Sequence, residues 1–375
     1  MTRYAEPTLT HESPGRIAPI LWLAPLILGG FGILMVTSTT SNFVYDSSGT
    51  PFTMGMKQLR SLGLGFVVML VASCITIRFW YNVAGILWVV SVIMAMGTLV
   101  PGIGMQAGGA IRWLNIAGVS VQPSEIMILA VVLECGKIFD RHKADETKAF
   151  ITMMTMIAIS AAPLLCQPDL GTTIFLTMVC MGMFVGRFGW KLPLCSGTFC
   201  AAAVAVLVFI QPYRMRRIFA FLDPFDDPRG NGYQIIQGLI AFANGGGGGA
   251  GLGHGFQKLQ YLPAASTDFI YAALGEELGL VGTMGVLALA AIWMLHCRSL
   301  YKMLPDGFKS SVTWGITLTV ILPFFINIGG VTNLMPLTGM PLPFVSYGGS
   351  AMIMSWARIG ILLRLEREIL RGYPA

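Results

Sequence analysis

The sequence predicts an all-α integral membrane protein: a bundle of ten transmembrane helices with a large fourth extracytoplasmic loop. Hydrophobic residues make up 55% of the 375 residues and charged residues only 11%, whereas about 25% of the residues in a soluble domain are charged. Apolar runs of about 17 to 25 residues recur along the chain, and each can cross a hydrocarbon core roughly 30 Å thick. No long period-two alternation is present, so the spans are expected to be helices and not the strands of a barrel.

The apolar runs place the ten helices in order along the chain. The first run is followed by no small-x-small cleavage site, so we expect a retained helix and not a signal peptide. We expect a tail at 1–17, a transmembrane domain at 18–366 that includes the outer loop 213–268, and a second tail at 367–375. The predicted spans are 18–38, 61–79, 83–101, 123–139, 150–166, 171–187, 192–212, 269–296, 311–332 and 348–364.

Basic residues predict the orientation, because short cytoplasmic loops are enriched in Lys and Arg. With both termini in the cytoplasm, most of the basic residues in short loops fall on the inner side. No nucleic-acid partner is expected. The inner basic residues are Arg78, Lys137, Arg141, Lys143, Lys148, Arg187, Lys191, Arg298, Lys302, Lys309, Arg364, Arg367 and Arg371.

Cysteine and histidine give no sign of a metal cage or a disulfide. The seven cysteines form no CxxC pair, and the four histidines show no HExxH spacing. Buried cysteines usually behave as small hydrophobic residues. We therefore expect neither a disulfide nor a metal held by protein ligands.

Two outer segments are too long to be simple connectors, at 108–125 and 213–268. Loops of such length are usually functional. Within the second, the stretch 233–243 fits either an amphipathic helix on the lipid surface or a buried helix that caps the bundle. The run Gly245–Gly249 lacks the Lys-Ser/Thr ending of a phosphate loop, which favours a flexible hinge.

Three arginines in four residues follow the seventh predicted span, at Arg214, Arg216 and Arg217. Basic residues at helix ends often anchor to lipid headgroups. Together with Arg112, however, they are suited to an outward phosphate site, because guanidinium groups bind phosphate oxygens in a bidentate fork. A lipid linked through a diphosphate would fit such a site.

Three acids, Asp268, Glu276 and Glu277, lie near the start of the eighth predicted span. At membrane depth the two glutamates require protonation or a cationic partner. Asp268 either caps the helix or acts as a base. It is eight residues from Glu276, about 12 Å along a helix, which is beyond the roughly 5 to 9.5 Å of a glycosidase pair. A single base suffices where the leaving group is a diphosphate.

Several motifs agree in order with one family. They are AIRWLNIAGVSVQPSE, QPDLGTT, FLDPFDDPRGNGYQIIQGLIAF, LPAASTDFIYAALGEELGLVG and NLMPLTGMPLPFVSYGGSAMIMSWARIG. The chain resembles the SEDS proteins (shape, elongation, division, sporulation), the group of FtsW and RodA. Its motif sequences are closer to those of FtsW than to those of RodA. The resemblance extends from the second predicted span to the last.

The resemblance implies the SEDS fold of ten transmembrane helices and the polymerisation of lipid II into peptidoglycan strands. It also implies a class B penicillin-binding protein and other division proteins as partners, and a place in the cytoplasmic membrane at the division septum. The essential outer aspartate of the family corresponds to Asp268. Its other outer polar residues and C-terminal motif correspond to Arg112, Gln122, Ser124, Glu125, Arg214, Arg217, Pro343, Ser346, Tyr347 and Gly348.

Three positions depart from the family pattern. Ile111 replaces the first arginine of GARRW, Ile128 replaces a lysine three residues after Glu125, and Ser266 replaces the histidine of HTDF. Without that lysine, Glu125 is expected either to be protonated or to pair elsewhere.

The expected mechanism is a direct displacement. Asp268 accepts the proton of the acceptor 4-hydroxyl, while Arg214 and Arg217, with Arg112 or a Mg²⁺ or Mn²⁺ ion, hold the departing diphosphate. Two alternatives stay open: a lipid II flippase, and a non-catalytic scaffold for the penicillin-binding protein. The acids and arginines are mostly at the outer face, which favours the enzyme.

Overall fold

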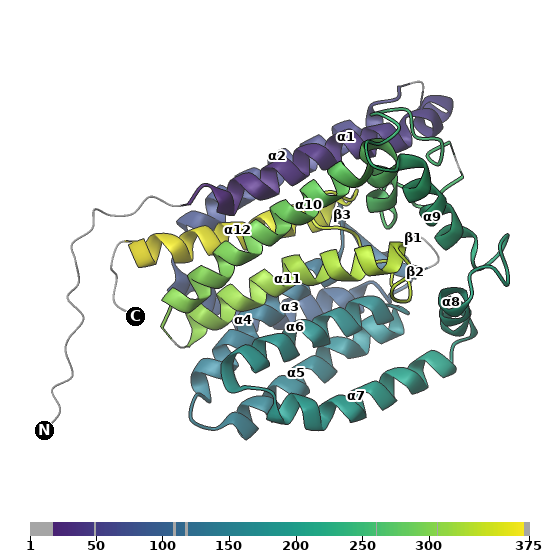
Figure 1. Ribbon diagram of the computed structural model, residues 1–375. Helices are drawn as coiled ribbons and strands as arrows, with labels where there is room; N and C mark the ends of the chain where they lie inside the picture. Colours follow the sequence, from purple (N-terminus) through teal and green to yellow (C-terminus); the bar gives the residue numbers. More distant parts are fainter. Residues whose placement is uncertain are drawn as a thin grey trace, which may run out of the picture.

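The computed structural model describes residues 18–48, 50–107, 110–116, 119–259, 261–305 and 307–370. The predicted tail at 1–17 lies outside the described residues, as do residues 371–375 of the second tail. Ten long helices run through the molecule side by side (Figure 1). They are α1 Ile20–Ser48, α2 Thr53–Cys74, α3 Ile77–Gly97, α4 Pro123–Arg141, α5 Glu146–Cys166, α6 Leu170–Phe188, α7 Lys191–Phe209, α10 Ile270–Met303, α11 Phe308–Val331 and α12 Gly349–Leu370.

Within the described part of the chain, seven helices are long and apolar enough to cross a membrane: α1 over Ile20–Ser41, α2, α3, α5, α6, α10 and α11. Helices α4 and α12 carry several charged side chains, such as Glu134 and Arg364. The predicted class, an α-helical multi-pass membrane protein, is confirmed, and the exact number of ten spans stays a prediction.

The helix boundaries follow polar capping residues that hydropathy alone does not reveal. The predicted spans 61–79 and 83–101 are wrong at their ends, because one helix stops at Cys74 and the next begins at Ile77. The side chain of Thr76 accepts a hydrogen bond from the backbone N–H of Phe79 and so caps the second helix. Asp145 caps α5 in the same way, by accepting from Lys148 N at 2.9 Å.

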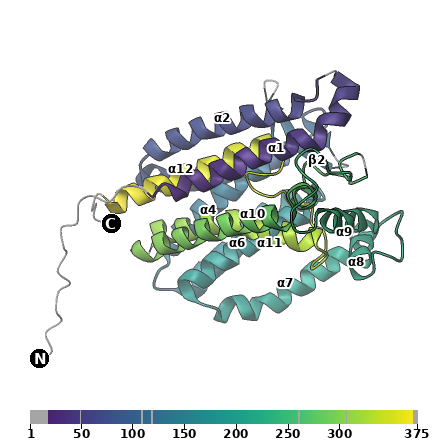
Figure 2. The same cartoon turned by 45° about the horizontal axis from the view of Figure 1, so that its top comes forward.

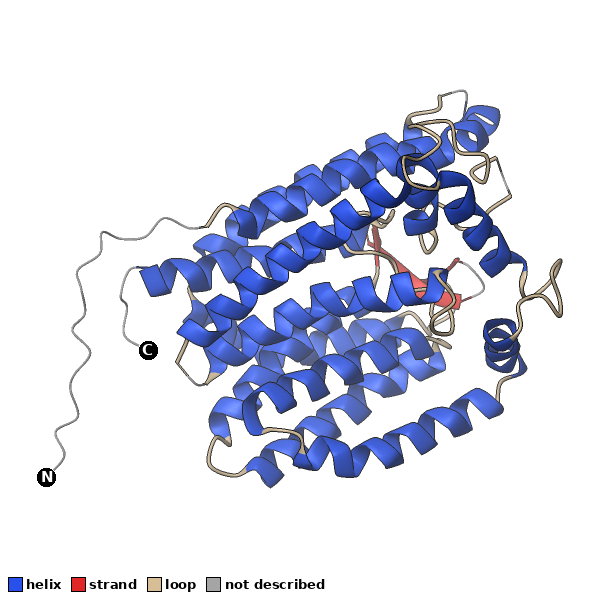
Figure 3. Cartoon of the chain, in the orientation of Figure 1, coloured by secondary structure: helices blue, strands red, loops and turns tan. Residues whose placement is uncertain are grey.

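The chain between α3 and α4, which includes most of the first outer segment, forms a small sheet that is not predicted from the sequence. Strands β1 Gly104–Ala107, β2 Ala110–Ile116 and β3 Val119–Val121 pair antiparallel in the order β1-β2-β3. Leu114 faces Val121 across the second pair. The sheet lies at the end of the bundle that also holds the loop helices (Figure 3). It places Arg112, on β2, above the membrane helices.

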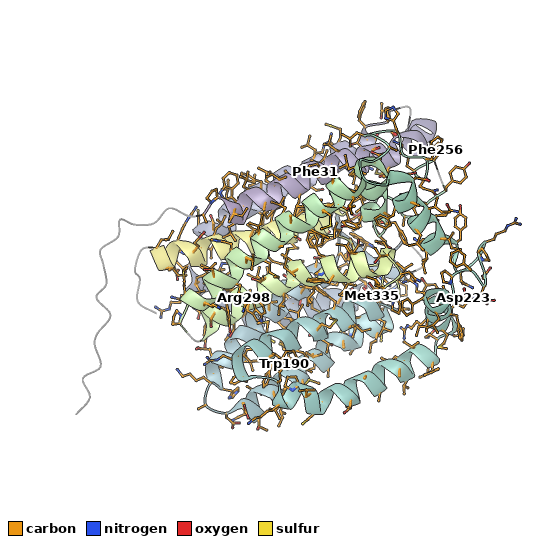
Figure 4. All side chains as sticks on the ribbon, viewed as in Figure 1. Phe31, Trp190, Asp223, Phe256, Arg298 and Met335 are labelled. Carbon is orange, nitrogen blue, oxygen red and sulfur yellow. The ribbon has the colours of Figure 1, made fainter. Side chains whose placement is uncertain are left out.

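Two shorter helices belong to the long outer loop, α8 Pro212–Leu222 and α9 Tyr233–Gly245. Helix α9 packs against α10, and its buried face includes Ile235 and Ala241. This packing favours the capping interpretation of the stretch 233–243. Asp223 and Phe256 lie at this end of the bundle, whereas Arg298 lies at the opposite end (Figure 4).

Helices α1, α2 and α12 form one side of the molecule (Figure 2), and α2 and α12 pack closely along their length. A Cβ on Gly360 of α12 would lie 2.4 Å from the backbone oxygen of Met69, so only glycine permits this approach. The start of α1 meets the end of α12, because the N–H of Ala18 donates to Glu366 Oε1 at 3.2 Å. The described chain therefore begins and ends on the same face of the bundle.

Candidate active site

The turn before α10 and the segment 337–348 are held together at the outer end of the bundle. Ser346 Oγ donates to the carbonyl of Thr267 at 2.6 Å, and the N–H of Tyr347 donates to the carbonyl of Ser266 at 2.9 Å. Asn327 of α11 donates to the carbonyls of both Asp268, at 2.7 Å, and Met340, at 2.8 Å. These bonds fix the backbone of Asp268 against the bundle.

The carboxylate of Asp268 does not cap α10. The N-cap position is Phe269, and no side chain bonds to the first turn. Among the described residues, the carboxylate accepts no hydrogen bond, although Arg217 and Arg112 are near enough to act on it. Burial raises the pKa of Asp268 above its usual range, and the positive charges of Arg217 and then Arg112 oppose this rise. The group is therefore a stronger base than an exposed aspartate.

Gly339 marks the position of the carboxylate. A Cβ built on this residue would lie 3.4 Å from Asp268 Oδ2 and 3.9 Å from Arg217 Nη1. The backbone here has φ of 72°, which favours glycine. Arg217 donates to the carbonyl of Leu337 at 3.0 Å and to the hydroxyl of Tyr213, and its guanidinium lies over the Tyr213 ring. A base and a fixed cation thus border the same turn.

Arg112 reaches the site from the small sheet. Its Nη2 donates to the carbonyl of Pro168 at 3.2 Å, and its Nε lies 3.6 Å from Asp169 Oδ2. Asp169 also caps α6 by accepting from the N–H and hydroxyl of Thr172. The helix cap and the arginine therefore share one carboxylate, which anchors the guanidinium beside the cavity.

A cavity of about 120 Å³ opens next to this corner. Seven of the sequence-predicted site residues line it, and Gly339 connects its wall to Asp268 and Arg217. The segment 338–344 forms one side, and residues of α4, α6, α11 and α12 form much of the rest. The lining site residues are Arg112, Gln122, Glu125, Pro343, Ser346, Tyr347 and Gly348.

Two predicted site residues lie elsewhere. Arg214 donates through Nη1 to the carbonyl of Leu207 at 2.7 Å and so satisfies the end of α7. Ser124 is buried at the start of α4 and does not line the cavity. The structure therefore groups Asp268, Arg217 and Arg112 together and leaves Arg214 and Ser124 apart.

Polar residues at the site that are absent from the sequence prediction include Gln58, Asp169, Asn327 and Arg358. Gln58 is fully buried, donates to the carbonyl of Ser346 at 3.0 Å and accepts from the N–H of Gly348 at 3.3 Å. Arg358 pairs with Glu125 at 2.8 Å. An amide or guanidinium within an apolar run signals a polar partner inside the bundle, but the sequence does not tell which partner it is.

The carboxylates that line the cavity do not fit a divalent ion held by the protein. Glu125 is paired with Arg358, and Asp169 is paired with Arg112. Within the described ranges, no three His, Cys, Asp or Glu side chains gather as a metal site would require.

Glu276 and Glu277 bind a different part of the outer loop, which we call the acid clamp: both glutamates with Asn244, Gly253, Phe256, Gln257, Lys258 and Ser38. Glu276 accepts from the Asn244 side chain and from the backbone of Phe256 and Gln257 at 3.1 to 3.3 Å. Glu277 accepts from Ser38 at 2.6 Å, Gly253 N at 2.9 Å and Lys258 at 3.0 Å. Lys258 is the cationic partner that a buried glutamate requires.

The glycine run completes this region. Helix α10 is broken at Gly279, where φ is 64° and ψ is −161°. Backbone N–H groups of Ala250 and Gly251 donate to the carbonyls of Glu276 and Glu277, and Leu280 N donates to Gly246 O at 2.9 Å. These bonds argue against the flexible hinge that the sequence predicts. The loop instead satisfies the backbone groups exposed by the break.

Comparisons with known proteins identify the family. The family model described as "Cell cycle protein", of the FtsW, RodA and SpoVE group, matches residues 19–370. The probable peptidoglycan glycosyltransferase FtsW of Coxiella burnetii is 34% identical over 92% of this chain and 95% of its own length. The stage V sporulation protein E of Bacillus subtilis is 33% identical over 96% of this chain and 99% of its own length.

A solved structure supports the same conclusion. A chain from a study titled "Structural coordination of polymerization and crosslinking by a peptidoglycan synthase complex" is 25% identical, with a TM-score of 0.76 over 93% of this chain and 97% of that one. The protein therefore belongs to the FtsW/RodA/SpoVE family, the SEDS family that its motifs indicate.

Proposed function

We propose that this protein is a peptidoglycan glycosyltransferase, which polymerises lipid II into glycan strands at the outer face of the cytoplasmic membrane during cell division. Its membership of the FtsW/RodA/SpoVE family supports the reaction class. The observation that carries the proposal is the carboxylate of Asp268, which is partly buried, accepts no hydrogen bond from the described residues and borders Arg217 beside the cavity.

Asp268 is the general base. Its carboxylate takes the proton of the acceptor sugar's 4-hydroxyl while that oxygen forms a bond to the anomeric carbon of the donor. The bond from this carbon to the diphosphate breaks, and its electron pair leaves with the diphosphate oxygen. A single displacement converts an α-linked donor into a β-linked product. The raised pKa of Asp268 suits this role, because it brings the base closer to neutral pH.

Arg217 and Arg112 stabilise the departing diphosphate. Both guanidinium groups are held by carbonyl oxygens, Arg217 by Leu337 and Arg112 by Pro168, so little reorganisation is needed when negative charge develops. Arg214 is engaged with the end of α7, and we assign it to positioning of α8. A Mg²⁺ or Mn²⁺ ion would enter with the diphosphate of the substrate, because the two acids that line the cavity, Glu125 and Asp169, are each paired with an arginine.

The partners and location follow from the same assignment. We propose that a class B penicillin-binding protein cross-links the strands, acting together with other division proteins at the septum. The solved structure of a peptidoglycan synthase complex that this chain resembles supports such a pairing. We place both termini in the cytoplasm: the basic inner loops support this side, and the contact of Ala18 with Glu366 supports a common side for the two ends of the described chain.

The test is polymerisation of labelled lipid II by the purified protein in liposomes, with and without its class B penicillin-binding protein. Asp268→Asn keeps the shape of the side chain and removes its basicity, and we expect the rate to fall by about 10²-fold or more. Asp226→Asn is the matched control, because Asp226 is an exposed acid of the same outer loop. It should polymerise at nearly the wild-type rate.

The other outcomes lead to the alternatives. A wild-type protein that makes no polymer under any partner or cation condition contradicts the enzyme and calls for a lipid II flipping assay. Polymer made equally well by Asp268→Asn contradicts the assignment of the base. Wild-type stimulation of the penicillin-binding protein without polymer of its own indicates a scaffold.

A further inference from the structure

A buried ion pair joins two helices in the wall of the cavity. Arg358 Nη2 of α12 lies 2.8 Å from Glu125 Oε2 of α4, and the exposed fractions of the two side chains are only 4% and 15%. Both residues line the cavity. Arginine is always charged in proteins, so a buried arginine needs an anionic partner. Each member of the pair is therefore the charge partner of the other.

The residue next to Glu125 on the same face of α4 cannot supply this charge. Ile128 is three residues further along the helix, which makes the two side chains neighbours. It is 6% exposed and lines the same cavity. Across the cavity, Arg112 is engaged with Asp169, so within the described residues Glu125 finds its ion-pair partner only on α12.

We infer that Arg358 is a positioning residue: it supplies the counter-charge of Glu125 from α12, since Ile128 on α4 carries none. The effect on polymerisation rests on the proposed function. Arg358 pairs with Glu125 in the cavity wall and joins the two helices on which the lining residues Ile128 and Met352 lie.

A second contact shows that α4 and α12 are joined at two levels. The N–H of Gln122, before α4, donates to Ser350 Oγ at 3.2 Å, and Ser350 Oγ donates to the carbonyl of Ser120 at 3.1 Å. Ser350 precedes Arg358 by eight residues, or about 12 Å along the helix. The ion pair therefore joins α4 and α12 at the inner part of their interface, and neutral hydrogen bonds join them at its outer part.

The arginine also keeps unused donor capacity. Arg358 Nε is buried and has no hydrogen-bond partner among the described residues. A lysine on Ile128's side would present a single ammonium to Glu125, whereas the planar guanidinium can serve Glu125 with one nitrogen and the cavity with another. The guanidinium of Arg358 is thus suited to hold Glu125 in place.

Rescue of activity tests the inference. Arg358→Met should polymerise lipid II at least tenfold more slowly than the wild type. Adding Ile128→Lys to Arg358→Met returns a cation to the neighbour of Glu125 and should restore the rate to within about threefold of the wild type. Ile128→Met in the same background is the matched control, because it changes the side chain without adding charge, and it should not restore the rate.

Thermal unfolding in detergent tests the pair without any assay of activity. Arg358→Met should lower the unfolding temperature by about 5 °C or more, because it leaves a buried carboxylate unpaired. Removing both charges, with Glu125→Gln and Arg358→Met together, should unfold at a higher temperature than Arg358→Met alone. Ile128→Lys should also raise the unfolding temperature of Arg358→Met.

The two proposals fail in different ways. A wild type that makes no polymer contradicts the proposed function, while the unfolding temperatures still decide the ion pair. An Arg358→Met protein with the rate and unfolding temperature of the wild type overturns the inference. Failure of Ile128→Lys to improve either property of Arg358→Met overturns it too.

Discussion

Two groups of acids lie within ten residues at the start of α10 and are used in opposite ways. Glu276 and Glu277 are almost fully buried, at 1% and 2% exposed, and their oxygens accept hydrogen bonds from the outer loop, from Ser38 and from Lys258. Asp268 is also largely shielded from water, but its carboxylate accepts no hydrogen bond from the described residues. The carboxylates of the acid clamp therefore have their hydrogen-bond partners within the chain, whereas the carboxylate of Asp268 has none among the described residues.

This difference separates a structural acid from a reactive one. A carboxylate whose oxygens are all engaged has no free position from which to take a proton. Asp268 retains its acceptor capacity, and its backbone is nonetheless fixed by Asn327 and by the bond between Ser346 and Thr267. Rigid support with an open functional group is the arrangement that a general base requires.

The largest expected effect on stability comes from removing the cation of the acid clamp. Lys258→Met should destabilise the protein by about 3 kcal/mol, because Glu277 would remain buried without its counter-charge. Lys57→Met, at an exposed lysine of α2, is the control and should change stability by less than about 0.5 kcal/mol. Unfolding in detergent measures both, and equal stability of the two variants would contradict the role of the clamp.

Substitution of the glycine at the break in α10 should reduce stability by less than Lys258→Met does. Gly279→Ala places a Cβ about 2.3 Å from Gly249 N at a φ of 64°, so the glycine run must move. We expect a loss of about 2 kcal/mol. Gly285→Ala lies in the same helix with open space around it and should be neutral or slightly stabilising. If both substitutions have the same effect on the unfolding temperature, the loop does not support the break.

The smallest expected effect is a shift of the pH–rate profile, which tests the charges around Asp268. The positive charge of Arg217 lowers the pKa of Asp268, in opposition to burial, so Arg217→Gln should raise that pKa further. Because the carboxylate is the active form, the acid limb of the pH–rate profile should move to higher pH. Arg216→Gln, at the exposed neighbour on α8, should leave the limb in place. A limb that does not move in Arg217→Gln would mean that another group controls it.

The sequence predicts the membrane helices well because the signal is local. A run of about 20 apolar residues is needed to cross the bilayer wherever it occurs, and each predicted span overlaps a helix. The small sheet is missed because its strands are only three to seven residues long. The break at Gly279 is missed because it depends on a loop some thirty residues earlier, roughly Gly246–Gly251.

The site is predicted only in part for the same physical reason. Family motifs mark Asp268, Arg217 and Arg112, and the fold brings these three together. The partner of Glu125 is 233 residues away in sequence, at Arg358, and the support of Asp268 comes from Asn327, 59 residues away. Such pairs depend on how the helices pack, and no periodicity within a single helix reveals them.

The most direct test measures the polymerisation rate and the unfolding temperature of Asp268→Asn and Glu276→Gln in parallel. Asp268→Asn should lose activity by about 10²-fold or more and keep its unfolding temperature. Glu276→Gln should lose about 1 to 3 kcal/mol of stability, because backbone donors of Phe256 and Gln257 lose a charged acceptor, and should retain more activity than Asp268→Asn. The reverse pattern, with an active Asp268→Asn protein and an inactive but stable Glu276→Gln protein, would contradict the assignment of the base.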